Sequence, residues 1–138
     1  MLNYDRLIKQ LIEHEGLELM PYVCPAGKLT IGVGLNIESC GISEHEARVM
    51  LKNDIKECAE DLASILPLWD EIGALRQIAL IDMRFNLGHK GFLGFKKMIQ
   101  AIKEGDWYKA RLEALDSQWA IQVGARAIRV ADEMGSNI

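Results

Sequence analysis

The chain has little of what marks a small secreted protein, and its start has none of the features of a membrane anchor. It contains three prolines and three cysteines in 138 residues. Charged side chains at Asp5, Lys9, Glu13 and Glu15 interrupt its first twenty residues. No apolar stretch there is long enough for a signal peptide or a membrane span. We therefore expect the protein to accumulate in the cytoplasm of the cell that makes it, without stable membrane insertion.

The cysteines do not have the number or spacing of a disulfide framework or of a zinc site. Cys24, Cys40 and Cys58 are an odd set, and none falls into a CxxC or Cys/His spacing of the kind that binds zinc. Without a secretion signal, free thiols are the expected state, and a Cys24–Cys40 disulfide remains an alternative. The sequence predicts no metal site.

A basic patch is also missing. The net charge of -4 lies entirely in the first 60 residues, which hold six basic and ten acidic side chains, whereas the rest has ten of each. Nucleic-acid-binding proteins usually show a basic patch or stripe, so we expect no nucleic-acid partner. Hydrophobic residues make up 49% of the chain and charged residues 26%, which is typical of one soluble globular domain of this length.

The N-terminal third has a regular pattern of short elements. Apolar residues between Tyr4 and Ile12 recur at helical spacing, and this stripe ends near Gly16. Prolines and glycines then punctuate a region of short β-segments. The run Leu29–Val33 predicts a strand, with Tyr22–Val23 as its partner across a Pro-Ala-Gly turn.

From residue 43 onward the pattern is helical. Ser43 followed by Glu46 is the sequence signature of a capping box at a helix start, and Pro67 ends that helical unit. Asp106 is a suitable N-cap for a later helix. The remaining helices are expected at about 70–87, 92–104, 106–115, 117–122 and 125–133.

Three side chains with different chemistry follow the first helix at short intervals. Glu15 supplies a carboxyl at the helix end, Cys24 an ionisable thiol and Thr30 a hydroxyl. A carboxyl at the end of an apolar helix can be partly desolvated, which raises its pKa and lets it donate a proton near neutral pH. A short hairpin returning past that helix end would bring the thiol and the hydroxyl to the other side of a bound substrate.

The spacing of Glu15, Cys24 and Thr30 resembles the Glu-Asp/Cys-Thr triad of the phage-type lysozymes (glycoside hydrolase family 24). Further segments resemble that family in the same order along the chain: Leu75–Gly88 with its central buried helix, Gly91–Phe95 with the next helix start, then Trp119 and Arg126–Val130. The resemblance therefore extends from about Leu7 to Val130.

The resemblance implies an α+β, two-lobed lysozyme-like fold, with a small β-hairpin N-terminal lobe and a helical C-terminal lobe joined by a long helix. Residues 1–138 would form one lysozyme domain. The N-terminal lobe would cover about 14–42, the connecting helix about 43–63 and the C-terminal lobe about 64–138, with helix 1–13 packed on the C-terminal lobe.

The resemblance also implies an activity. The protein would be a muramidase that hydrolyses the β-1,4 bond between N-acetylmuramic acid and N-acetylglucosamine in bacterial peptidoglycan. It would act as a monomer without a cofactor. As the endolysin of a phage or prophage, it would need a holin to pass from the host cytoplasm to the cell wall.

By this resemblance Glu15 would be the general acid, and Thr30 would orient the attacking water. Cys24 stands where the family usually has Asp, and three roles stay open for it: a base for water, an electrostatic stabiliser of the oxocarbenium-like state, or a nucleophile that gives retention. We favour the first two together, because the family pattern admits Cys here.

Four other residues are candidates around the triad. Tyr22, Asn86 and the backbone around Gly88 are expected to contact sugar, because an aromatic ring packs on a sugar face and an amide bonds to an N-acetyl group. Arg126 is expected to hold Glu15, although a nearby cation lowers the pKa of a carboxyl whereas a general acid needs it raised.

Two other functions remain open. A thiol hydrolase would use Cys24 as nucleophile with a histidine base, but no histidine forms a recognisable motif with it. A wall-binding module that has lost catalysis would fit the acidic N-terminal part and the replacement of Asp by Cys. Loss of all activity on alkylation, with Glu15→Gln still active, would support the thiol hydrolase. Binding to sacculi without release of reducing sugar would support the wall-binding module.

Overall fold

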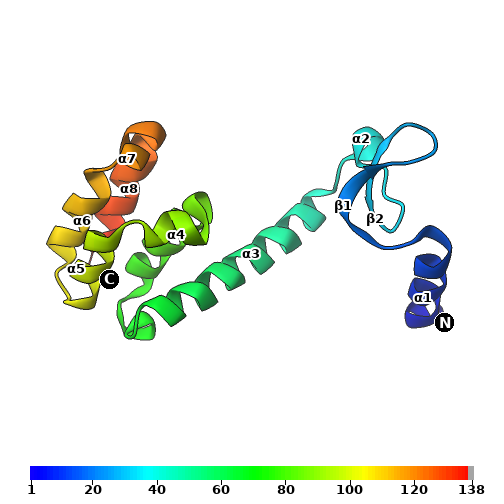
Figure 1. The fold of residues 1–138 in the computed structure, drawn as a ribbon. Coiled ribbons are helices and arrows are strands. Elements are labelled where there is room, and N and C mark those ends of the chain that lie inside the picture. The colour runs from blue at the N-terminus through cyan, green and yellow to red at the C-terminus, as the bar shows by residue number, and fades with distance from the viewer. Residues whose placement is uncertain (137–138) are drawn as a thin grey trace. The chain divides into compact units, whose positions relative to one another are not determined.

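The computed structural model describes residues 1–136 and has an α+β fold, mostly helical with one small antiparallel hairpin (Figure 1). This agrees with the expected fold class. The chain divides into two compact units, Met1–Val49 and the residues from Met50 onward. Among the described residues, no helix is long and apolar enough to cross a membrane.

The first unit begins with helix α1 (Tyr4–Glu15), which confirms the helix predicted from the apolar stripe. The side chain of Asn3 caps its start by accepting from the backbone N–H of Arg6 at 3.0 Å. Gly16 ends it at a φ of 82°, with its N–H bonded to the carbonyl of Ile12. The carboxyl of Glu15 is therefore carried by the last residue of a well-capped helix.

The predicted hairpin is present. Strand β1 (Glu18–Val23) pairs antiparallel with β2 (Leu29–Gly32), and Tyr22 lies opposite Thr30. The pairing is irregular between Glu18 and Tyr22. The short helix α2 (Ile37–Cys40) follows and contacts β2.

Helix α3 (Glu44–Ile65) starts at the predicted capping box. The Ser43 hydroxyl accepts from the N–H of Glu46 at 3.1 Å, and the Glu46 carboxylate accepts from the N–H of Ser43 at 2.9 Å. These reciprocal bonds satisfy backbone groups at the helix start. The bond from the Ser43 N–H, followed by one from the Ser43 hydroxyl, holds the pKa of the Glu46 carboxyl below its ordinary value. The helix ends two residues before Pro67, as expected.

The second unit is a helical group around one apolar core (Figure 1). Its elements after α3 are the 3-10 turn η1 (Trp69–Glu71) and the helices α4 (Ala74–Leu93), α5 (Lys96–Lys103), α6 (Trp107–Leu115), α7 (Gln118–Val123) and α8 (Ala125–Met134). The core is built of side chains that all these helices contribute, among them Leu62, Leu80, Met83, Phe92, Met98, Ala110, Trp119 and Val130.

Glycines explain where these helices differ from the predicted ranges. The helix predicted at 70–87 starts only at Ala74, because Gly73 has a φ of 99° and separates it from η1. Gly88, with φ 76° and ψ 173°, interrupts α4 at the predicted joint. A further helical turn follows to Leu93, so α5 begins at Lys96 rather than at 92. Asp106 caps α6 as predicted, accepting from the N–H of Lys109 at 3.0 Å.

Candidate active site

The hairpin brings Cys24 and Thr30 to one backbone oxygen. The carbonyl of Lys28 accepts from the N–H of Cys24 at 2.9 Å and from the hydroxyl of Thr30 at 2.9 Å. The turn between the strands is closed by a bond from the N–H of Gly27 to the carbonyl of Cys24 at 2.8 Å. Two of the three predicted triad residues are therefore held in one local network.

The same turn perturbs the thiol. A hydrogen bond from the Lys28 backbone, followed by one from the Thr30 hydroxyl, holds the pKa of the half-buried Cys24 below its ordinary value, and desolvation opposes them only in part. A lower pKa increases the thiolate fraction at neutral pH. Thr30 has a single hydroxyl proton. The hydroxyl donates it to the Lys28 carbonyl when Cys24 is protonated, and it can rotate to donate to the Cys24 thiolate instead.

Thr30 is enclosed in the hairpin. It is the only buried polar residue among those the structure describes, with 3% of its surface exposed. A buried hydroxyl keeps its partners because an unsatisfied one is costly. The fold therefore sets the position of the Thr30 oxygen, and its proton has partners on the same turn.

Glu15 lies against the chain that leaves this hairpin. An ideal Cβ placed on Gly34 would stand 2.9 Å from Oε2 of Glu15, so only a glycine lets the carboxylate approach there. Gly34 follows Thr30 by four residues, so the end of α1 and the exit of β2 meet at Glu15. The carboxyl is exposed, which differs from the partial burial expected for a helix end.

Tyr22, the other candidate in the first unit, is half-buried in β1 and pairs with Thr30 across the hairpin. Strand pairing places it beside the network of Cys24 and Thr30. Its predicted contact with sugar remains a prediction.

Asn86 and Gly88 lie at the break in α4, in the second unit. The side-chain oxygen of Asn86 accepts from the indole N–H of Trp119 at 2.7 Å. Trp119 is buried and packs edge-on against Phe95, with ring centroids 6.1 Å apart. This bond fixes the exposed Asn86 side chain, so its amide N–H groups are the part available to a ligand.

Arg126 has an acidic partner within its own unit, which the sequence did not reveal. Its Nε donates to Oδ1 of Asp82 at 2.7 Å, and its Nη2 lies 2.6 Å from the same oxygen. The partners are 44 residues apart, so no local pattern signals the pair. The expected role of Arg126 toward Glu15 stays a prediction, and Asp82 is a residue that sequence reasoning missed.

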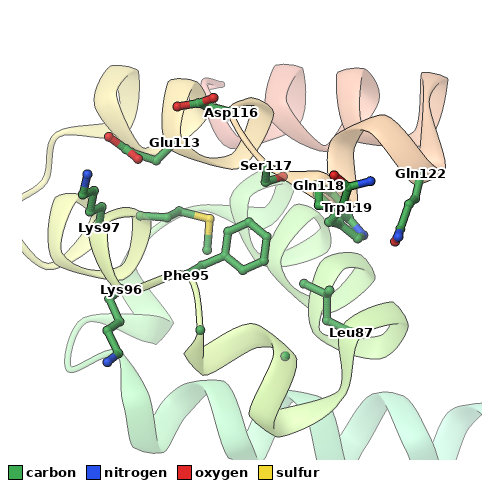
Figure 2. Close-up of a pocket in the computed structure, with 13 residues that line it drawn as sticks. Leu87, Phe95, Lys96, Lys97, Glu113, Asp116, Ser117, Gln118, Trp119 and Gln122 are labelled. Atoms are coloured by element: carbon green, nitrogen blue, oxygen red, sulfur yellow. The ribbon is translucent and has the colours of Figure 1, made fainter.

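A hollow of about 580 Å³ opens beside Trp119 in the second unit. Figure 2 shows Leu87 of α4, Phe95 at the N-cap of α5 and Trp119 of α7 pointing into it. Charged side chains of both signs also line it: Lys96, Lys97, Glu113 and Asp116. Gly91 and Gly94 line it too, next to the break in α4.

The residues from 1 to 136 contain no group of three or more His, Cys, Asp or Glu side chains placed to hold a metal ion. The first unit itself offers a carboxyl at a helix end, a thiol of lowered pKa and a buried hydroxyl. This set can donate a proton, and it can orient or activate water.

Residues 12–130 match the model of the family described as phage lysozyme. The chain is 30% identical over 152 residues to the pre-baseplate central spike protein Gp5 of Enterobacteria phage T4, covering 90% of this chain and 26% of that protein. It is also 29% identical over 93 residues to the probable T4-type lysozyme 2 of Dictyostelium discoideum, covering 64% of this chain and 54% of that protein. The chain thus spans about a quarter of the first relative and about half of the second.

The family match covers most of the chain and includes all the candidate site residues, from Glu15 to Arg126. The fold has the hairpin and the helical group that the sequence resemblance implied. The chain belongs to the phage lysozyme family.

Proposed function

We propose that the protein is a glycoside hydrolase that cleaves the β-1,4 bond between N-acetylmuramic acid and N-acetylglucosamine in bacterial peptidoglycan. The observation that carries the proposal is the arrangement of the first unit. The Lys28 carbonyl organises Cys24 and Thr30, while Gly34 admits the Glu15 carboxylate at the exit of the same hairpin. The relatives named as lysozymes support the substrate class.

In this mechanism Glu15 protonates the leaving oxygen of the glycosidic bond. Glycosidases need such an acid and a second group that acts from the other face of the sugar. Because Glu15 is exposed, bound sugar would have to supply the desolvation that favours its protonated form.

Cys24 and Thr30 act on the opposite face. The lowered pKa of Cys24 increases its thiolate fraction, which favours a charged group that stabilises the oxocarbenium-like state and accepts a proton from water. Thr30 orients that water by accepting a hydrogen bond from it, while the single Thr30 proton is donated to the Lys28 carbonyl or to the thiolate. A nucleophilic thiolate would give retention instead of inversion, and product stereochemistry separates these outcomes.

The experiment that tests the proposal is release of reducing ends from purified peptidoglycan. Wild type is compared with Glu15→Gln, Cys24→Ala and Cys24→Asp under reducing conditions. We expect Glu15→Gln to abolish activity, Cys24→Ala to lower it strongly and Cys24→Asp to keep or raise it. An inactive wild-type protein that still binds sacculi would favour the wall-binding module, and full activity of Glu15→Gln would refute the assignment of the acid.

The cellular setting is a second part of the proposal. As an endolysin the protein would lyse its host once a holin permeabilises the membrane. Expression in a bacterium with and without a holin tests this, because lysis that requires both the holin and an intact Glu15 is expected. One relative is a phage spike protein by name, so lysis on external addition alone would favour a role in entry instead.

A further inference from the structure

The peptide unit between Lys28 and Leu29 connects the hairpin network to helix α2. Its oxygen accepts from the N–H of Cys24 and from the hydroxyl of Thr30, each at 2.9 Å. Its N–H, on Leu29, donates to Oε1 of Glu38 at 3.3 Å. A peptide unit is a rigid plane, so the Glu38 carboxylate at one edge fixes the direction of the oxygen at the other.

Glu38 is itself held in place. Its Oε2 pairs with Nζ of Lys28 at 3.4 Å. Its helix, α2, is capped by the side chain of Asn36, which accepts from the N–H of Ser39 at 3.1 Å, and α2 contacts β2. The Glu38 and Lys28 side chains are 49% and 48% exposed, and an ion pair this exposed adds little stability. The expected effect of Glu38 is therefore on geometry rather than on folding.

We propose that Glu38 is a positioning residue for the hydrolysis proposed above, acting through the Lys28–Leu29 peptide on Cys24 and Thr30. The inference rests on that proposed function. If the peptide rotates, its oxygen leaves the Thr30 hydroxyl and the Cys24 N–H, and both reacting groups lose their fixed direction. Misplacement of a reacting group by about 1 Å can cost about 100-fold in rate. Glu38 acts on the reacting groups only through this peptide, so we expect a smaller loss of rate when Glu38 is replaced.

Two substitutions separate the peptide contact from the ion pair. Glu38→Ala removes both, whereas Glu38→Gln keeps an oxygen for the Leu29 N–H and removes only the charge. We expect Glu38→Ala to lower kcat about ten-fold with KM within about two-fold of wild type, and Glu38→Gln to restore most of kcat. Glu44→Ala is the matched control, because Glu44 is another exposed glutamate of the first unit and pairs only with Arg48 on its own helix among the described ion pairs, at 3.2 Å. It should keep wild-type kcat.

A second measurement does not depend on enzyme activity. In a Cys40→Ser background, iodoacetamide reports on Cys24, because Cys58 is buried. Glu38→Ala should slow alkylation of Cys24 several-fold near neutral pH, since the turn contacts that favour the thiolate are loosened. Glu38→Gln should react like wild type, and thermal unfolding checks that each variant is folded.

The outcomes separate the two proposals. If wild type releases no reducing ends but Glu38→Ala still slows alkylation and Glu38→Gln does not, the hydrolase proposal fails and the positioning of the hairpin by Glu38 stands. If wild type is active and Glu38→Ala keeps both kcat and the alkylation rate, Glu38 is not a positioning residue. If Glu38→Gln loses as much kcat as Glu38→Ala, the contact with the Leu29 N–H does not account for the effect of Glu38, and the inference is overturned.

Discussion

Glu15 and Gly34 are in close approach: a Cβ on Gly34 would stand 2.9 Å from Oε2 of the Glu15 carboxylate and 3.5 Å from its Cδ. The last residue of α1 therefore touches the backbone that leaves β2. Gly34 also has a φ of 66°, a region that other residues rarely adopt. The backbone conformation therefore favours glycine at this position, and a side chain there would displace the carboxyl of the proposed catalytic acid.

Gly34→Ala should reduce activity more than stability. The new methyl group displaces the end of the flexible Glu15 side chain. This side chain moves aside at little energetic cost, but its carboxyl is then no longer held in place. Gly32→Ala is the matched control, because Gly32 has a φ of 69° and nothing lies within 4 Å of the point that its Cβ would occupy. Both variants should lose about 1–2 kcal/mol of unfolding free energy from the backbone conformation.

Only Gly34→Ala should also lose most of its kcat on peptidoglycan. Reducing-end release and denaturant unfolding, measured on both variants, decide the matter. Equal activity of Gly32→Ala and Gly34→Ala would mean that the contact with Glu15 is not used in the reaction.

The three thiols should react at different rates. The pKa of Cys24 is lowered by its turn, first by the Lys28 backbone and then by the Thr30 hydroxyl. Cys58 is buried, and desolvation raises its pKa against the opposing charge of Arg84. Iodoacetamide near neutral pH should therefore modify Cys24 readily and leave Cys58 unmodified in the folded protein.

Thr30→Val should slow the alkylation of Cys24 by removing the hydroxyl while keeping the shape of the side chain. Peptide mapping by mass spectrometry follows each site separately, and the exposed Cys40 serves as an internal control that this substitution leaves unchanged. A Cys24 rate that is the same in Thr30→Val and wild type would exclude the hydroxyl as a cause of the lowered pKa.

Asn86 has a structural bond and a predicted contact with sugar, and two substitutions separate them. Asn86→Ala leaves the buried indole N–H of Trp119 without its acceptor, which should cost about 1–3 kcal/mol of unfolding free energy. Asn86→Asp keeps an oxygen for Trp119 but loses the amide donors, so it should retain most of the stability. If the amide binds an N-acetyl group, Asn86→Asp raises KM for peptidoglycan. An unchanged KM would remove Asn86 from the sugar site.

Local features were predictable from the sequence because their partners are neighbours in the chain. The capping box of Ser43 and Glu46 satisfies itself within four residues, and the hairpin turn follows from its own proline and glycine. The break at Gly73 was missed because a glycine in a helical pattern does not reveal whether its φ is positive.

Contacts over longer range were not predictable. Arg126 was singled out for its place in the chain, but its pairing with Asp82 spans 44 residues and depends on how two helices pack. Glu38 accepts from the N–H of Leu29, nine residues away in the chain. Its proposed role is to orient the Lys28–Leu29 peptide. The sequence signal identified the candidate reacting groups, whereas the residues that hold them are visible only in the folded chain.

Asp61 joins α3 to α4 through a mostly enclosed ion pair. Its Oδ2 accepts from Nε of Arg84 at 2.6 Å, with the two side chains 16% and 12% exposed, and Nδ1 of His89 lies 2.9 Å from the carboxylate. Desolvation alone would raise the pKa of Asp61, but the bonds from Arg84 and His89 together outweigh it and the pKa is lowered. The folded state therefore binds the Asp61 proton less readily than the unfolded state does.

A lowered pKa in the folded state contributes stability above the ordinary aspartate pKa, and that stability is lost as the pH falls through the folded value. Asp61→Asn should accordingly lower the unfolding free energy by about 3 kcal/mol near neutral pH, and the difference from wild type should shrink as the pH falls below about 4. Asp132→Asn is the control, because Asp132 is 66% exposed and lies 3.6 Å from Arg111. The unfolding free energy of Asp132→Asn should fall by less than about 1 kcal/mol. Urea unfolding of the three proteins across this pH range tests the prediction, and a difference for Asp61→Asn that persists undiminished in acid would show that charge is not the source of its effect.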